Sequence, residues 1–249
     1  MLANVESAKT TFNEALAAKP NYAPAQLGLA RLEAIKGNLA EANKIVDEVL
    51  LKSPREADAW HFKGDLQRAE QKLPEALAAY QKVLEIKPNT ASVHVNIIML
   101  QMQDKKLDLA AKQLTEMQKV AAKQPLTVYL TALIAFNKKD LATASSAVEN
   151  LLKMQPDNPQ GLQLAGAIAY QKQSDIQAQD SLSKALKKSP GLDYSRRLLV
   201  KSYLRSKQPA KALATLQPVL QGTAVPPAWL TLAGEVYMQN GDAERAAEF

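Results

Sequence analysis

Apolar and polar residues recur along this chain with the spacing of amphipathic helices. Within residues 57–71, one face is formed by residues at the i, i+3, i+4, i+7 spacing, namely Trp60, Lys63, Gly64 and Gln67. A second stretch, residues 74–86, places Ala76, Tyr80 and Val83 on one face. Pro88 then disfavours the helical conformation for Lys87, and Thr90 can cap a following helix. The pattern predicts two helices joined by a short turn.

This two-helix pattern repeats every 34 residues. Proline stands at 20, 54, 88, 156 and 190, with Ala122 at the one skipped place. Alanine keeps the same interval at every step, at Ala8, Ala42, Ala76, Ala110, Ala144, Ala178, Ala212 and Ala246. An interval of 34 residues accommodates two helices of about twelve to fourteen residues and two turns. We expect Gly64 and Ala76 to be small because the paired helix backbones approach closely there.

These residues resemble the tetratricopeptide-repeat (TPR) motif, W-x2-L-G-x2-Y…A-x3-F…A…P. The direct matches are Trp60, Gly64, Ala76, Tyr80 and Pro88. The small eighth position is also kept by Ala30, Ala132, Gly166 and Gly234, whereas Ile98 and Val200 depart from it. The resemblance covers the whole chain and implies an all-α fold, a right-handed α-solenoid of helix-turn-helix repeats.

The repeat register predicts one solenoid over residues 1–249. Its expected parts are a partial repeat 1–22, full repeats 23–56, 57–90, 91–124, 125–158, 159–192 and 193–226, and a partial repeat 227–249. No polar capping repeat is visible, so we expect a piece of a longer array. Repeat 91–124 lacks its closing proline, which favours a longer second helix. Pro218 should kink or shorten the helix that contains it.

The composition removes several functional classes. The chain has no cysteine, and its formal net charge of +6 comes from interspersed residues without a block of Lys and Arg. His61 and His94 lie in different repeats, and no spacing pairs either with a carboxylate or a second ligand. Catalytic and phosphate-loop motifs are absent. We therefore expect no catalytic residue, no metal site, no cofactor, no nucleic-acid partner and no transmembrane helix; the first twelve residues do not resemble a signal peptide.

In TPR proteins the concave surface is lined mainly by the first helix of each repeat. When the groove-lining repeat positions of the TPR family are carried over to this chain, they give an apolar set of candidate groove residues: Val95, Met99, Met102, Tyr129, Leu133, Phe136 and Tyr170. Exposed together they would form an interaction patch; the alternative is that they pack between neighbouring helices or contact another part of a longer array. Beyond Tyr194, the residues Arg197, Lys201 and Arg205 form a cationic stripe with no acid among them. Such a stripe favours an anionic ligand; the alternative is a solvated basic face.

Residues 25–50, 128–171, 194–220 and 229–249 together resemble the TPR lipoproteins of the PEP-CTERM/exosortase system. This resemblance implies a periplasmic or membrane-anchored bacterial envelope protein linked to exopolysaccharide production and protein sorting; a cytoplasmic location is the alternative. The expected function is a non-enzymatic scaffold that binds an extended peptide or partner segment in its concave groove. The alternatives are a module that binds acidic polysaccharide and a structural spacer in a longer array.

Overall fold

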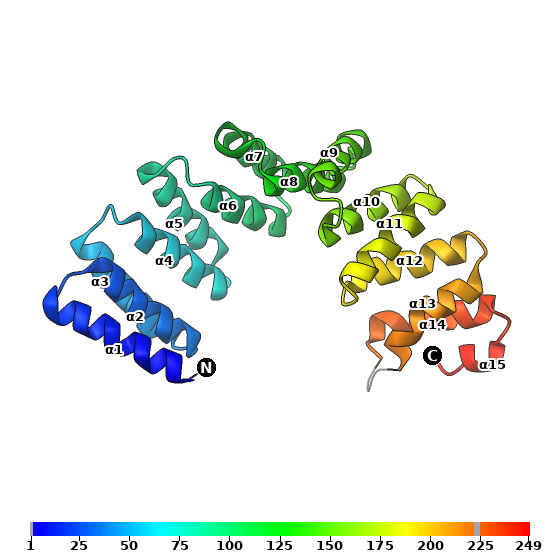
Figure 1. Cartoon of the computed structure of the whole chain (residues 1–249), viewed down its shortest axis with the longest axis horizontal. Coiled ribbons are helices and arrows are strands. Elements are labelled where there is room, and N and C mark those ends of the chain that lie inside the picture. The colour runs from blue at the N-terminus through cyan, green and yellow to red at the C-terminus, as the bar shows by residue number, and fades with distance from the viewer. Residues whose placement is uncertain (1, 222–224) are drawn as a thin grey trace. The chain divides into compact units, whose positions relative to one another are not determined.

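The computed structural model describes residues 2–221 and 225–249, with side chains from residue 5 onward. Every regular element in these described ranges is a helix, which confirms the all-α prediction. The chain divides into two compact units, residues 1–121 and 122–249. Figure 1 shows the helices following one another as side-by-side pairs within each unit.

The first unit contains seven helices: α1 (Leu2–Ala18), α2 (Ala23–Ile35), α3 (Leu39–Lys52), α4 (Ala57–Ala69), α5 (Leu73–Ile86), α6 (Ala91–Gln103) and α7 (Leu107–Ala121). The pairs α2–α3, α4–α5 and α6–α7 form its repeats.

The second unit contains the remaining eight helices of the described chain: α8 (Pro125–Asn137), α9 (Leu141–Met154), α10 (Pro159–Gln171), α11 (Asp175–Lys188), α12 (Asp193–Arg205), α13 (Pro209–Leu220), α14 (Pro227–Gln239) and α15 (Ala243–Ala246). Within it the first helices of successive repeats also touch, because α10 contacts both α8 and α12.

The recurring alanines lie where the paired helices meet. Six of them have no solvent-exposed surface: Ala42, Ala76, Ala110, Ala144, Ala178 and Ala212. Ala8 and Ala246, in the terminal repeats, are partly buried. Because a single methyl group fills each contact, the second helix of a repeat can pack closely on the first.

The reason for a small residue at Gly64 differs from the expected backbone contact. A Cβ atom added at Gly64 would lie 2.6 Å from Cε1 of the Tyr80 ring, which is fully buried. At Gly166 an added Cβ would lie 2.5 Å from Cγ of Leu182. Glycine is therefore required because the large side chain of the second helix occupies the space beside it.

The turn after the first helix of each repeat contains a residue in the left-handed conformation. Gly37 and Gly241 have φ values of 87° and 84°, and five non-glycine residues take the same position at φ of 55–63°: Gln71, Lys105, Lys139, Gln173 and Lys207. In each case two backbone bonds close the turn, for example from Gln71 N to Arg68 O (3.0 Å) and from Lys72 N to Gln67 O (2.8 Å). These paired bonds are those of the Schellman motif, so seven repeats turn in the same way.

The fourth residue of three repeats hydrogen-bonds to the carbonyl of the preceding proline. Trp60 Nε1 donates to Pro54 O (2.8 Å), and Arg196 Nη2 donates to Pro190 O (2.8 Å). His94, which is 5% exposed, places Nε2 3.1 Å from Pro88 O. A carbonyl only accepts, so Nε2 of His94 carries the hydrogen and Nδ1 accepts from the Gln113 amide. Three different side chains thus hold the same turn.

Both predicted irregularities in helix length are present. α7 has 15 residues, one more than α5 or α9, because no proline closes its repeat. α13 has 12 residues and contains Pro218. Proline removes a helical hydrogen bond and crowds the preceding turn, so this helix is the shortest of the second helices that belong to full repeats.

Candidate functional site

The predicted groove residues are divided between the two units. Val95 and Met102 are partly buried and Met99 is 46% exposed; all three lie on α6, in the first unit. The remaining candidates lie on α8, α10 and α12 of the second unit. We use the name α8–α12 face for the side of these helices that carries the candidate residues Tyr129, Leu133, Phe136, Tyr170, Tyr194, Arg197, Lys201 and Arg205.

On the α8–α12 face, the apolar residues of α8 serve the core as well as the surface. Tyr129, Leu133 and Phe136 are partly buried because they pack against a core cluster that includes Ala144 and Ile168. Burial raises the pKa of the Tyr129 phenol, so this side chain stays neutral at physiological pH. Because Tyr129, Leu133 and Phe136 pack against the core, their exposed atoms are held in place, as a preformed contact surface requires.

A cavity of about 440 Å³ opens beside Tyr129. Leu126, Tyr129 and Leu151 form its apolar part. Its other lining residues are Pro125 and four side-chain amides, those of Gln124, Gln155, Asn158 and Gln160. The side chain of Asn158 also caps α10 by accepting from Gly161 N at 2.8 Å, which fixes that edge of the cavity. A cavity lined by both apolar side chains and amides can hold a side chain and hydrogen-bond the peptide groups next to it.

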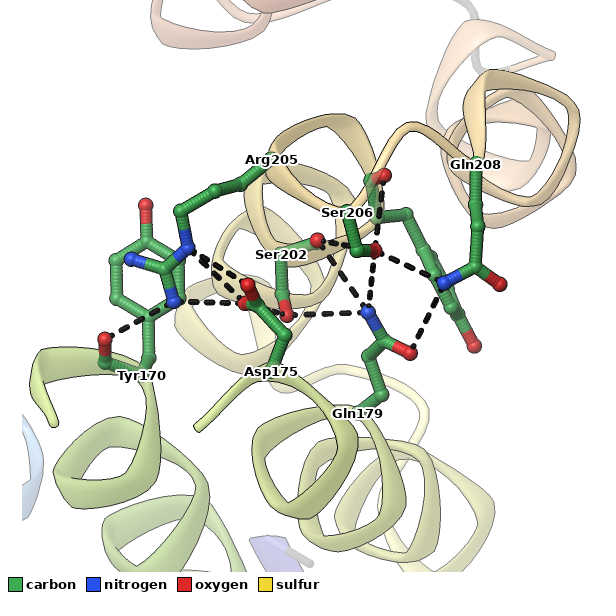
Figure 2. A network of polar contacts seen from close by, with 8 residues as sticks. Tyr170, Asp175, Gln179, Ser202, Arg205, Ser206 and Gln208 are labelled. Carbon is green, nitrogen blue, oxygen red and sulfur yellow. Dashed lines mark hydrogen bonds and ion pairs between the residues drawn. The ribbon is translucent and has the colours of Figure 1, made fainter. Parts of the chain in front are cut away.

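The cationic stripe is not uniform, because Arg205 already has an acidic partner. Its guanidinium binds both carboxylate oxygens of Asp175, with Nη2–Oδ1 at 2.7 Å and Nε–Oδ2 at 2.9 Å. It also donates to the Tyr170 carbonyl at 3.0 Å and lies 4.0 Å from the centre of the Tyr170 ring. Figure 2 shows Arg205 held between these two residues. The three cations of the stripe are therefore not equivalent, because Arg205 is paired with an acid from the preceding repeat.

The same network joins α11 to α12 and the following turn. Ser202, fully buried, donates to Asp175 Oδ1 at 2.6 Å. The Gln179 amide donates to Ser206 Oγ at 2.8 Å, and Gln208 donates to the same oxygen at 2.9 Å (Figure 2). These bonds bind neighbouring repeats together and make Arg205 a structural residue.

Asp175→Asn is expected to lower the free energy of unfolding by about 1–2 kcal/mol at neutral pH, because two charge-assisted bonds are weakened. The Arg205 guanidinium, followed by the Ser202 hydroxyl, holds the pKa of Asp175 below its usual value. A depressed folded-state pKa gives stability that is complete above the unfolded value of about 3.9 and is lost as pH falls through the folded value. The difference in free energy of unfolding between wild type and variant should therefore disappear below about pH 4.

Urea unfolding followed by circular dichroism over a pH series measures this difference in free energy of unfolding. The matched control is Asp180→Asn, because Asp180 pairs with Lys184 in an exposed i, i+4 arrangement. Such a pair contributes only about 0.3–0.5 kcal/mol. Equal losses in the two variants would contradict a structural role for the Arg205 network.

Arg197 and Lys201 differ from Arg205 in having no acidic partner. Neither forms an ion pair within the described chain, and the buried Nε of Arg197 has no hydrogen-bond acceptor. Tyr194, three residues before Arg197, is 43% exposed. Burial of its ring raises the pKa of the phenol, and the nearby Arg197 charge partly offsets that rise. Tyr194, Arg197 and Lys201 follow the i, i+3, i+7 spacing of one side of α12. Ser195 of the same helix donates to Gln163 of α10 at 3.1 Å, so the two helices meet near this level.

Both histidines have structural partners. His94 holds the turn before α6, and His61 packs edge-on against Tyr80 with its Nε2 3.0 Å from the Asn96 amide. In the described residues, no three His, Cys, Asp or Glu side chains gather as a metal site would require. Over the same described ranges, none of the helices has the length and apolar content needed to cross a bilayer.

Family models for tetratricopeptide repeats match this sequence at both ends. Two models described as "Tetratricopeptide repeat" match residues 3–66 and 197–249, and one described as "TPR repeat" matches residues 64–97. The matched ranges cover more than half of the chain. The chain belongs to the tetratricopeptide-repeat family. No curated protein matches this TPR sequence.

Solved TPR structures share the fold at low sequence identity. A tetratricopeptide repeat protein from Parabacteroides merdae is 15% identical, with a TM-score of 0.73 over 90% of this chain and 88% of that one. The pilF protein of Pseudomonas aeruginosa is 16% identical, with a TM-score of 0.67 over 79% and 90% of the two chains. YrrB, described as a TPR protein with an unusual peptide-binding site, is 17% identical, with a TM-score of 0.60 over 75% and 96%. These similarities establish the fold of the chain.

Proposed function

We propose that this TPR chain is a non-enzymatic interaction scaffold that binds an extended peptide across the α8–α12 face. The observation that carries the proposal is the cavity beside Tyr129, which is lined by both apolar side chains and Asn and Gln amides. An extended peptide offers both a side chain for the apolar lining residues and unpaired backbone groups for the amides. The first helices of helical repeats form the extended surfaces that such proteins use for binding. YrrB, which shares the fold, is described as having a peptide-binding site.

The test is selection of peptides by the full chain from a displayed random library. Enriched peptides should share an aliphatic or aromatic residue, and Leu126→Arg should weaken their binding about tenfold because it puts a charged side chain into the apolar part of the cavity. Leu126 is 46% exposed, so the substitution leaves the core intact. The control is Ile176→Arg, because Ile176 is 85% exposed on α11, away from the cavity.

Three outcomes contradict this proposal. Recovery of no enriched peptide favours a structural spacer. Equal weakening by Leu126→Arg and Ile176→Arg places the binding site elsewhere. Retention of the full chain on an acidic polysaccharide such as heparin, unaffected by Leu126→Arg, favours a polysaccharide-binding module.

We also infer a role in bacterial envelope machinery for exopolysaccharide production or protein sorting. The support is the resemblance of four stretches of the sequence to the TPR lipoproteins of the PEP-CTERM/exosortase system. Fractionation of cells that produce this protein from its own gene tests the inference. Recovery in the cytoplasmic fraction alone would contradict it.

A further inference from the structure

Arg197 is the one partly buried cation in the described chain that lacks a partner. Only three Lys or Arg residues there are partly buried rather than exposed, and they are Lys63, Arg196 and Arg197. Lys63 pairs with Asp47 at 2.9 Å, and Arg196 donates to the carbonyls of Pro190 and Thr215. Arg197 has neither an ion pair nor a carbonyl acceptor. A partly desolvated charge without a partner is costly, so the site gains free energy when an anion arrives.

The acidic groups closest in sequence and packing do not neutralise this site. Asp193, one turn before Arg197 on α12, is exposed and forms no ion pair. Asp175 is engaged by Arg205. Glu235, on the adjacent helix α14, is exposed and also forms no ion pair within the described residues. Lys201, one helical turn beyond Arg197, adds a second unpaired cation to the same face, so the local charge favours an anionic ligand.

Three residues at equivalent repeat positions show how far this site lies from the cavity. Tyr129, Gln163 and Arg197 are separated by steps of 34 residues, so they stand at the same level of α8, α10 and α12. Neighbouring packed helices are about 8–10 Å apart, which places Arg197 roughly 16–20 Å from Tyr129. Gln163 lies between them; its Oε1 accepts from Ser195, which leaves its amide hydrogens to donate to a peptide carbonyl.

We propose that Arg197 and Lys201 form a carboxylate subsite for an Asp or Glu side chain of the bound peptide. An extended chain advances about 3.3 Å per residue, so the acidic residue lies about five or six positions from the residue seated beside Tyr129. The planar guanidinium of Arg197 provides paired donors for a carboxylate, and the Lys201 ammonium adds a point charge. Arg205 takes no part in this subsite. The inference rests on the proposed function, because it gives the sequence register of the same peptide.

The test compares peptide selections on the full wild-type chain and on the double variant Arg197→Gln, Lys201→Gln. Wild type should enrich peptides with Asp or Glu at about five or six positions from the apolar residue. The double variant should keep the apolar preference and lose the acidic one. A labelled peptide from the wild-type selection should bind the variant about fivefold more weakly, and its affinity should lose most of its salt dependence. The control is Lys187→Gln, an exposed cation on α11, which should select the same peptides as wild type.

A charge exchange separates a direct contact from a structural effect. Arg197→Glu should prefer the same peptide with Lys in place of its acidic residue, which loss of folding would not produce. Enriched peptides that show an apolar preference but no acidic one, or an acidic preference unchanged in the double variant, overturn the subsite and leave the proposed function standing. Recovery of no peptide by wild type overturns both.

Discussion

Replacement of Tyr80 by alanine is expected to lower the free energy of unfolding by about 3–5 kcal/mol. The ring has no exposed surface and packs in a cluster with Val83, Ile97 and Leu100. It also fills the space beside Gly64, which has no side chain to collapse into the resulting void. The substitution therefore removes apolar contacts and leaves a cavity. Urea unfolding followed by circular dichroism measures the loss.

Tyr80→Phe is the matched control, because it keeps the ring and removes only the hydroxyl. That hydroxyl donates to Asp65 at 2.6 Å, so its removal should cost about 0.5–1.5 kcal/mol. If the phenylalanine variant loses as much stability as the alanine variant, the hydrogen bond and not the packing dominates, contrary to this prediction.

Ala144→Leu is expected to destabilise the second unit by about 1–3 kcal/mol. Ala144 has no exposed surface and packs with Ala132, Val148 and Ile168 at the contact of α8, α9 and α10. A larger side chain there must push neighbouring helices apart or adopt a strained rotamer. Denaturant unfolding of the purified variant measures the cost.

The control for this substitution is Ala142→Leu on the same helix. Ala142 is exposed, and leucine is nearly as good a helix former as alanine, so the change should be close to neutral. Neutral behaviour of Ala144→Leu itself would be inconsistent with the burial of the recurring alanines and with the 34-residue register.

The sequence predicted the helices well because the repeat supplies the same local information many times. The interval between alanines locates each helix contact, and the prolines mark where second helices end. The two exceptions in length, α7 and α13, also followed from single residues, the missing proline at Ala122 and the extra one at Pro218. Because single residues determine these features, they can be predicted from the sequence alone.

The turns inside the repeats are harder to predict from the sequence. A left-handed residue is signalled in the sequence by glycine, and only Gly37 and Gly241 give that signal. At Gln71 and the four equivalent positions, a Lys or Gln adopts the strained conformation because the two Schellman hydrogen bonds and the packing of the paired helices hold it there. The tertiary structure, and not the residue type, determines these turns.

For the candidate site, repeat position placed each residue on the correct helix but did not reveal its partners. Asp175 and Arg205 are 30 residues apart, and their pairing depends on how one repeat stacks on the next. Likewise, the spacing of Tyr129 and Phe136 cannot separate a surface role from a packing role, and these residues have both. Repeat position therefore predicted which helices carry the candidate residues, whereas only the structure shows that Arg205 has an acidic partner and that Arg197 and Lys201 have none within the described residues.

The bond to the proline carbonyl has a consequence for how such repeats diverge. Indole, imidazole and guanidinium groups at Trp60, His94 and Arg196 all donate an N–H to the carbonyl of the preceding proline. Leu162 holds the same position after Pro156 and has no side-chain hydrogen to donate, so the turn tolerates changes of ring shape and charge there and also loss of the donor. Repeats can therefore lose their most recognisable aromatic residue without loss of architecture.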